Sequence, residues 1–289
     1  MCRINRYYGD EMKKISILMA VYNAEKTLDE AVASILAQTY QNWQFIICDD
    51  CSTDGTYDKL LQYKEQYPDK FVIIKNETNS KLAYSLNHCL QYADGEYIAR
   101  MDADDISLPE RFEKQVEYLD THSDIAVVGT SMIRFDENGD FSELLSYQNP
   151  DRYILKTAVP YFHATIMMRK EAMDIIGGYT VAKRTERGQD LDLWFKFYAN
   201  ELKGANLVEC LYKVREDRDA IKRRKLKYDL CFVKTRLIGF KLLKFPFAWK
   251  IYAIKPVLSH FIPYKLKVKR RNKQQAKTAE ARTVDKKVK

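Results

Sequence analysis

Three carboxylates lie within four positions in the segment Met101-Asp-Ala-Asp-Asp105, which follows the apolar run Tyr97-Ile-Ala. Carboxylates this close repel one another unless a cation lies among them. If the chain stays extended here, Asp102 and Asp104 point to the same side and can share one divalent ion. A hard cation with open coordination positions is suited to binding a diphosphate. The simpler alternative is a solvated acidic loop that caps the helix beginning near Pro109.

A second carboxylate pair, Asp49 and Asp50, follows another apolar run, Phe45-Ile-Ile-Cys48. The first hundred residues alternate between strand and helix patterns. Strands are predicted at about 15–21, 45–48, 71–74 and 97–101, and helices at about 27–38, from the turn at 52–55 to about 66, and at 82–92. This alternation predicts an α/β fold with a mainly parallel central sheet and helices on both faces. Ligands of such sheets bind beyond the carboxyl ends of the strands, where both carboxylate groups lie.

The composition excludes a disordered, collagen-like or low-complexity chain. The 289 residues are 46% hydrophobic and 30% charged, with 10 Gly and 7 Pro, which predicts a substantial core. The six cysteines lack a paired metal-ligand spacing, so we expect reduced thiols in an intracellular protein. Residues 1–14 lack an apolar signal-peptide region, and no apolar run approaches the roughly 20 residues that span a bilayer. We therefore expect a cytoplasmic protein.

The charge divides the chain in two. Residues 213–289 hold 25 Lys and Arg against 6 Asp and Glu, a net charge of +19, whereas residues 1–212 have a net charge of −11. A tail this basic suits a polyanion, either nucleic acid or an anionic lipid surface. We predict a catalytic body at residues 1–212, a basic helical extension at 213–272 and a disordered tail at 273–289.

Apolar residues alternate with lysines at helical spacing between Cys231 and Phe245, and Trp249 and Tyr252 follow. This pattern is typical of an amphipathic helix at a membrane interface rather than of an arm that grips phosphates. It favours an anionic membrane surface as a partner and argues against nucleic acid. The alternative is that the apolar face packs on the body while the lysines are solvated.

Four segments resemble glycosyltransferase family 2, and they occur in the order that the family has. They are Ser16-Ile-Leu-Met-Ala-Val-Tyr-Asn23, Ser34-Ile-Leu-Ala-Gln-Thr-Tyr40, Asp49-Asp-Cys-Ser-Thr-Asp-Gly-Thr56 and Arg100-Met-Asp-Ala-Asp-Asp105. The resemblance extends over about residues 14–212. It implies a GT-A fold, a nucleotide-sugar donor, a Mg²⁺ or Mn²⁺ ion, and inversion at the anomeric carbon.

The resemblance also implies roles beside the nucleobase. Ala20 matches a position that contacts the base through its backbone, and Tyr22 matches one whose ring stacks on the base. Asp50 matches the carboxylate that accepts a base N–H, which favours uracil or thymine. Asp49 is expected instead to brace the loop.

Further implied roles lie on the metal and acceptor sides. Asp102 matches the residue beside the ribose and the metal, and Asp104 matches the direct metal ligand. The segment Gly188-Gln-Asp-Leu-Asp-Leu-Trp194 resembles the family's Glu-Asp-x-Asp-Leu-Trp, in which the first Asp is the general base, so the base here is Asp190. An acceptor hydroxyl is too weakly acidic to ionise freely, so a carboxylate must take its proton as the bond forms. Gln189 stands where the family usually has Glu.

Three residues keep a second interpretation. Asp190 is also suited to favouring a helix N-terminus, although Asp192 fits that role better. His163 lies where relatives carry a residue near the acceptor, but a structural role is the preferred interpretation for a lone His before an apolar strand. Lys81 stands where relatives commonly have Gly, so it either contacts the diphosphate or faces water.

Together these features predict an inverting, non-processive glycosyltransferase, because the Gln-x-x-Arg-Trp segment of processive relatives does not follow Trp194. We expect one sugar to pass from a nucleotide sugar, preferably a UDP-sugar, to a hydroxyl of a glycan or lipid-linked glycan. The expected setting is surface-polysaccharide assembly at the inner face of a bacterial plasma membrane. Two alternatives share the fold. A nucleotidyltransferase would carry a Gly-rich basic loop where Tyr22-Asn-Ala-Glu25 stands, and a non-catalytic membrane scaffold would tolerate loss of Asp104 and Asp190.

Overall fold

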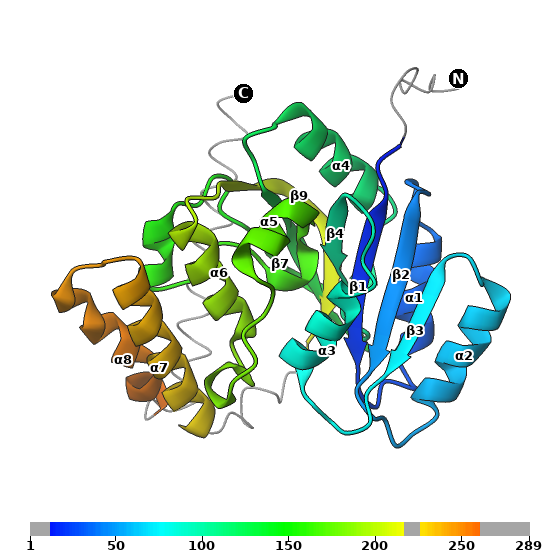
Figure 1. Ribbon diagram of the computed structural model, residues 1–289, viewed down its shortest axis with the longest axis horizontal. Coiled ribbons are helices and arrows are strands. Elements are labelled where there is room, and N and C mark those ends of the chain that lie inside the picture. Colours follow the sequence, from blue (N-terminus) through cyan, green and yellow to red (C-terminus); the bar gives the residue numbers. More distant parts are fainter. Residues whose placement is uncertain (1–11, 217–225, 261–289) are drawn as a thin grey trace.

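The computed structural model describes residues 12–216 and 226–260. Within these ranges, nine strands form one sheet in the order β3-β2-β1-β4-β8-β6-β9-β5, and β7 pairs with β6 (Figure 1). The strands are β1 (Ile15–Val21), β2 (Trp43–Asp49), β3 (Phe71–Lys75), β4 (Tyr97–Arg100), β5 (Ile106–Ser107), β6 (Val127–Asp136), β7 (Gly139–Leu144), β8 (Met167–Arg169) and β9 (Gly204–Arg215). The α-helices are α1 (Leu28–Leu36), α2 (Thr56–Gln66), α3 (Leu82–Leu90), α4 (Arg111–Thr121), α5 (Lys170–Ile176), α6 (Gln189–Ala199), α7 (Leu226–Leu242) and α8 (Lys250–His260).

The first four strands are parallel, as the alternation of strand and helix patterns predicts. β1 pairs with β2 on one side and with β4 on the other, and β2 pairs with β3. Val21 lies opposite Asp49 in this register, so β1 and β2 end level with each other. The residues that follow these strands therefore share one edge of the sheet.

Beyond β4 the sheet becomes mixed, so the prediction of a mainly parallel sheet holds for its first half. β4 and β8, β8 and β6, β6 and β7, and β9 and β5 all pair antiparallel, while β6 and β9 pair parallel. β6 and β7 form a hairpin whose turn passes through Gly139, with a φ of 103° that an L side chain rarely adopts. Short connections of this kind join antiparallel strands, whereas parallel strands need a crossover.

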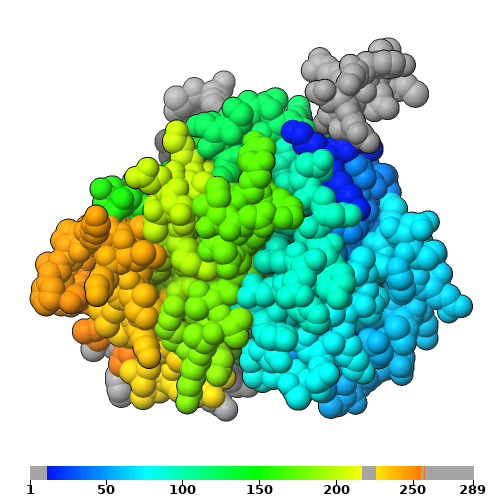
Figure 2. Space-filling model, viewed as in Figure 1, coloured from blue at the N-terminus to red at the C-terminus, as the bar shows by residue number. Residues whose placement is uncertain are grey.

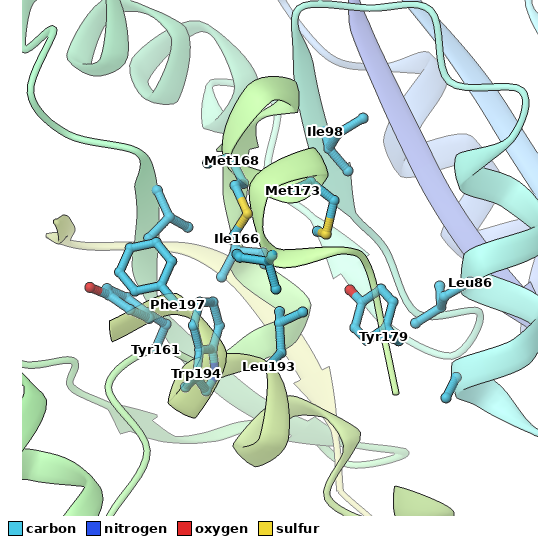
Figure 3. Packing of buried hydrophobic residues seen from close by; sticks show 14 of the residues in the cluster. Leu86, Ile98, Tyr161, Ile166, Met168, Met173, Tyr179, Leu193, Trp194 and Phe197 are labelled. Atoms are coloured by element: carbon cyan, nitrogen blue, oxygen red, sulfur yellow. The ribbon is translucent and has the colours of Figure 1, made fainter. Parts of the chain in front are cut away.

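Helices cover both faces of the sheet, which confirms the predicted α/β fold. Residues of β1 alternate between the two faces. Ile15, Ile17 and Met19 pack with α1, α2 and α4, and Leu18 packs with α3, α5 and α6. Figure 3 shows the cluster on the Leu18 face, in which the Tyr179 ring lies between Leu86 and Leu193, and Trp194 of α6 packs beside Tyr161 and Phe197. This packing fixes α6, which bears the predicted base in its first turn.

The C-terminal helices pack on α6 through aromatic contacts. The Phe240 ring of α7 lies edge-on to the Phe195 ring of α6, with 5.9 Å between centroids. Phe245 then contacts both Phe240 and Trp249, which leads to α8. No helix within the described ranges is long and apolar enough to cross a bilayer. Residues 217–225 and 261–272 of the predicted basic extension, and the predicted tail at 273–289, lie outside the described residues.

Gly239→Ala is expected to destabilise the protein. A Cβ at Gly239 would lie 2.2 Å from the buried Phe195 ring, so α7 or the ring must shift. Overpacking of this kind costs about 1–3 kcal/mol, although Gly→Ala within an exposed helix gains up to about 1 kcal/mol. Thermal unfolding measures the change, with Lys234→Ala on the exposed side of α7 as the control. A rise in melting temperature for Gly239→Ala would contradict this packing.

Candidate active site

Polar side chains gather where the parallel strands end. Asp50 follows β2, and its buried carboxylate accepts three hydrogen bonds. Asn76 Nδ2 and the Ser80 backbone N–H donate to Oδ1 at 2.8 and 2.7 Å, and the Lys81 backbone N–H donates to Oδ2 at 2.9 Å. Asp50 therefore fixes the loop after β3. The contact of Asp50 with a base N–H stays a prediction. It would use a lone pair of the carboxylate that these three hydrogen bonds do not occupy.

The loops after β1 and β2 are bound to each other. The Ser52 backbone N–H donates to Asp49 Oδ2 at 3.2 Å, so Asp49 braces the loop as expected. The Asn23 N–H donates to Ser52 Oγ at 3.0 Å, and Asn23 Oδ1 accepts from the Thr53 N–H at 2.8 Å. These bonds leave the Tyr22 side chain 49% exposed above the strand ends. Ala20, near the end of β1 and two residues before Tyr22, is partly buried.

The three carboxylates after β4 have different surroundings. Asp102 Oδ1 accepts from Arg100 Nη2, and the Asp102 N–H donates to Tyr212 Oη at 3.2 Å. Asp104 has an exposed side chain. Asp105 is buried, and its Oδ1 accepts from the Arg215 backbone N–H at 2.8 Å. The chain is not extended here, because Ala103 and Asp104 form a turn in which the Asp105 N–H lies 3.4 Å from the Asp102 carbonyl, so the condition for the predicted alternation is not met. Asp104 is nevertheless exposed and Asp102 is partly exposed, whereas Asp105 is buried.

Mutual repulsion characterises this acidic group. Burial raises the pKa of Asp105 to about 8, and the Asp102 and Asp104 carboxylates act in the same direction. Desolvation and the Asp102 carboxylate likewise raise the pKa of Asp104. Such a group fits a divalent cation, because the ion would relieve the repulsion and the ligands are hard oxygens. Among the residues described, no three His, Cys, Asp or Glu side chains form a complete metal site, so further ligands must come from a bound substrate or water.

Arg100 holds Asp102 from below. Its side chain is fully buried, and Nη1 donates to the carbonyls of Leu18 and Met101 at 3.0 and 3.2 Å. Arg111, also buried, donates from Nη2 to the Arg100 carbonyl at 2.8 Å. The sequence interpretation missed both arginines. An arginine inside the apolar run before Met101 was the available signal, because a buried guanidinium requires partners.

Asp190 lies close enough to Arg100 and Asp102 for their charges to affect its pKa. Gly188, with a φ of 96°, begins α6 and is followed by Gln189, whose Oε1 accepts from the Gly188 N–H at 3.1 Å. Burial raises the pKa of Asp190. The Arg100 guanidinium lowers this pKa, and the Asp102 carboxylate raises it further. The fold thus brings Asp190 towards Asp102 although 88 positions separate them in the sequence. Asp192, by contrast, is buried in an ion pair with Arg184, a structural role.

His163 and Tyr179 form a buried pair between these groups and the core. His163 Nε2 and Tyr179 Oη are 2.9 Å apart, and the His163 ring lies edge-on to the Trp194 ring. Burial and the Arg100 guanidinium lower the pKa of His163 well below its usual value, so the ring is neutral. Burial raises the pKa of Tyr179, the Arg100 guanidinium lowers it, and the nearby Asp102 and Asp190 carboxylates raise it further. The contacts of His163 support its structural interpretation, and the sequence interpretation missed Tyr179.

Comparison with known proteins identifies the family. The profile for Glycosyl transferase family 2 matches residues 16–185. The chain belongs to glycosyltransferase family 2. It is 46% identical over 250 residues to "Putative glycosyltransferase EpsE" of Bacillus subtilis (strain 168), which covers 86% of this chain and 90% of that protein. It is 32% identical over 236 residues to the O-antigen biosynthesis glycosyltransferase WbnJ of Escherichia coli, covering 78% and 91%.

Solved structures share the fold of this family 2 glycosyltransferase. Residues 1–349 of TarS from S. aureus, in complex with UDP-GlcNAc, match with a TM-score of 0.64 and 21% identity, covering 85% of this chain and 72% of that one. The mannosyltransferase PcManGT from Pyrobaculum calidifontis, in complex with GDP-Man and Mn²⁺, matches with a TM-score of 0.64 and 16% identity, covering 87% and 71%. The GT-A fold and the enzyme class are confirmed, which sets aside the nucleotidyltransferase and the non-catalytic scaffold.

A cavity of about 430 Å³ adjoins the loop that Asp50 fixes in this glycosyltransferase. Its walls come from residues 80–83 and from residues 181–186, which precede α6. Lys81 lines it with a φ of 73°, and Lys81 Nζ donates to Asn79 Oδ1 at 2.6 Å. A volume of this size accommodates a small ligand. Lys81 thus borders a cavity and is also exposed. Its position is compatible with both predicted roles, contact with the diphosphate and exposure to water.

Proposed function

We propose that this enzyme transfers one sugar, with inversion, from a UDP-sugar to an acceptor hydroxyl. The observation that carries the proposal is the convergence of Asp102, Asp104 and Asp190 at one end of the sheet. Asp102 and Asp104 are two residues apart after β4, and the Asp102 carboxylate contributes to the raised pKa of both Asp104 and Asp190, which supports a shared site for them. One side of the site then suits a diphosphate with its cation, and the other suits a base for the acceptor.

The donor side is assigned to the ends of β1 and β2. The exposed Tyr22 ring offers a stacking surface for a nucleobase, and Ala20 offers its backbone. Asp50 is the carboxylate expected to accept a base N–H, which favours uracil. The UDP-GlcNAc in the TarS complex supports the uridine nucleotide, whereas the GDP-Man in the PcManGT complex marks guanosine as the competing choice.

Asp104 and Asp102 would hold Mg²⁺ or Mn²⁺. Their exposed oxygens and mutual repulsion fit a hard cation, and the Mn²⁺ in the PcManGT complex supports such an ion. When bound, the ion neutralises the charge that develops on a leaving diphosphate. Arg100 keeps the Asp102 carboxylate in place through Nη2.

Asp190 is assigned the role of general base. It accepts the proton of the acceptor hydroxyl while that oxygen attacks the anomeric carbon from the face opposite the diphosphate, which accounts for inversion. The first turn of α6 positions the carboxylate, and the buried Trp194 on the next turn fixes the helix. The neutral His163 orients the Tyr179 hydroxyl beside this carboxylate.

The acceptor is proposed to be a glycan or lipid-linked glycan of a surface polysaccharide. The name of WbnJ, an O-antigen biosynthesis glycosyltransferase, and that of the amylovoran biosynthesis glycosyltransferase AmsE of Erwinia amylovora support this class. We place the reaction at the inner face of the plasma membrane, on an anionic lipid surface, because residues 213–289 carry a net charge of +19.

A donor panel tests this function. Purified protein with Mn²⁺ is mixed with UDP- and GDP-sugars, and thermal stabilisation and slow release of the nucleoside diphosphate are measured. At least one UDP-sugar is expected to stabilise the protein and to be hydrolysed slowly, because binding to the native state raises its melting temperature. Stabilisation by GDP-sugars alone would overturn the donor assignment, and no effect of any nucleotide sugar would overturn the reaction.

Tyr22→Ala is expected to weaken UDP binding. Stacking of a base on an aromatic ring contributes about 1–3 kcal/mol, which corresponds to about five- to 150-fold in the dissociation constant. Titration calorimetry with UDP and Mn²⁺ measures the change. Tyr22→Phe keeps the ring and should bind like wild type, and Tyr92→Ala removes an equally exposed tyrosine elsewhere. Equal affinities for Tyr22→Ala and wild type would show that the base does not stack on this ring.

A further inference from the structure

Three apolar side chains of η5 (Phe247–Trp249) and α8 are strongly exposed. Phe247 is 80% exposed, Ile251 66% and Ile254 44%. Ile251 and Ile254 are three residues apart, which puts them on one side of α8, and Phe247 lies in the 3-10 turn that leads into this helix. In Figure 1 the α7–α8 pair lies at the edge of the molecule opposite β1–β3, and in Figure 2 it forms the orange and yellow end of the surface. Exposed apolar groups clustered like this mark an interaction site.

The exposed side of α7 continues this surface. Leu230, Ile238 and Leu242 are exposed at helical spacing, and the exposed Lys234 lies among them. The opposite side of α7 buries Gly239 and Phe240 against α6. Apolar side chains therefore lie on both sides of α7, and packing on the body accounts for only one of them. The alternative in which the helix simply packs on the body leaves the other side unexplained.

The charge around these side chains indicates which partner fits. Residues 226–260 contain seven Lys and Arg and one acidic residue, and residues 261–289 contain eleven and two. Lys250 Nζ lies 4.0 Å from the Phe247 ring centroid, and Lys156 Nζ lies 4.5 Å from that of Trp249. Cationic groups beside exposed aromatic and aliphatic side chains match the headgroup layer and the acyl boundary of an anionic bilayer. A second copy of the chain would place like charges together, and nucleic acid would leave the aliphatic side chains without a role.

The surface is also held rigidly to the catalytic part. Arg152 of η1 (Arg152–Lys156) donates from Nη2 to the Leu243 carbonyl at the end of α7. At the other end of α7, a Cβ on Gly188 would lie 2.8 Å from the Phe232 ring, so this ring packs against the residue that begins α6. A surface fixed to both ends of α7 holds Asp190 at a constant distance from whatever it binds.

We propose that Phe247, Ile251 and Ile254 insert into the surface of an anionic lipid bilayer while the lysines of α7 and Lys250 bind its headgroups. This proposal deepens the proposed function, since it names the surface that brings the enzyme to a lipid-linked acceptor. It does not depend on the chemistry of transfer. The α7–α8 pair is thus a docking surface that sets the height of the active site above the membrane.

Vesicle cosedimentation of the full chain tests the docking surface. Wild type is expected to bind mixed vesicles of phosphatidylglycerol and phosphatidylcholine, and to bind them less as salt rises. It is not expected to bind vesicles made only of phosphatidylcholine. Phe247→Glu and Ile251→Glu are each expected to lower the partition coefficient about tenfold or more. Ile175→Glu, at an isoleucine of α5 that is 57% exposed, is the control and should bind like wild type. Unchanged binding of Phe247→Glu and Ile251→Glu would overturn the proposal.

Two further measurements keep this result separate from the catalytic proposal. The Glu variants should keep the wild-type melting temperature, which shows that they fold, so their loss of vesicle binding stands even if no nucleotide binding or sugar transfer is ever detected. Light scattering reports a competing partner: a wild-type dimer that Phe247→Glu converts to a monomer, without vesicle binding, would replace the membrane with a second copy. Retention on duplex DNA that the Glu variants lose, again without vesicle binding, would replace it with nucleic acid.

Discussion

Asp190→Asn is expected to bind the donor like wild type and to transfer sugar about 10²–10⁴-fold more slowly, the usual contribution of a general base. The amide keeps the shape of the side chain but cannot take a proton. The substitution also removes a negative charge that burial and the nearby Asp102 carboxylate both disfavour, so we expect no loss of stability of the folded protein. Donor affinity by calorimetry and initial rates with acceptor measure the two effects separately.

Asp192→Asn provides the matched control for the base. Asp192 lies on the same turn of α6, but its carboxylate is buried against Arg184. Loss of that ion pair should lower the melting temperature while the rate per folded molecule stays within a few-fold of wild type. Turnover retained by Asp190→Asn, or lost equally by Asp192→Asn, would place the base elsewhere.

Asp104→Ala is expected to abolish the dependence of UDP binding on Mn²⁺. Asp102 and Asp104 are the two carboxylates available to the ion, and a single carboxylate cannot offset the cost of dehydrating the ion. In the presence of Mn²⁺ we expect UDP to bind the variant at least about tenfold more weakly than it binds wild type. Titration calorimetry with and without Mn²⁺ measures both quantities.

Uridine, which has no diphosphate, distinguishes this effect from damage to the base site. Its affinity should be the same for wild type and for Asp104→Ala. Asp124→Ala removes an exposed aspartate whose ion pair is with Lys203, and it should leave UDP binding unchanged. A Mn²⁺-dependent affinity that survives Asp104→Ala would assign the cation to other ligands.

The first half of the fold was predictable because its signals are local. Each of β1 to β4 is a short apolar run, and each of the first three is followed by a helix pattern. Parallel strands joined in this way end at one edge, so Asp50 and Asp102 could be expected near each other. β6 and β9 were not predicted. Neither strand is a continuous apolar run, and the residues that pair lie 77 to 80 positions apart with two register shifts, which no local pattern records.

The candidate site was predictable in its outward residues and not in their supports. Resemblance marks Asp104 and Asp190 as the residues expected to contact the metal and the acceptor. Arg100 and Tyr179 were missed because they act through contacts that only the folded chain makes, namely the ion pair of Arg100 with Asp102 and the bond between Tyr179 Oη and His163. The packing of α7 was left open for a similar reason, because it depends on Gly239 meeting the Phe195 ring.

Anomalous diffraction from crystals soaked with UDP and Mn²⁺ tests the central claim most directly. We predict a single strong manganese peak within bonding distance of Asp104, with Asp102 beside it, and UDP density that runs from this peak to the Tyr22 ring. A manganese peak remote from both carboxylates, or UDP bound away from the ends of β1, β2 and β4, would contradict it.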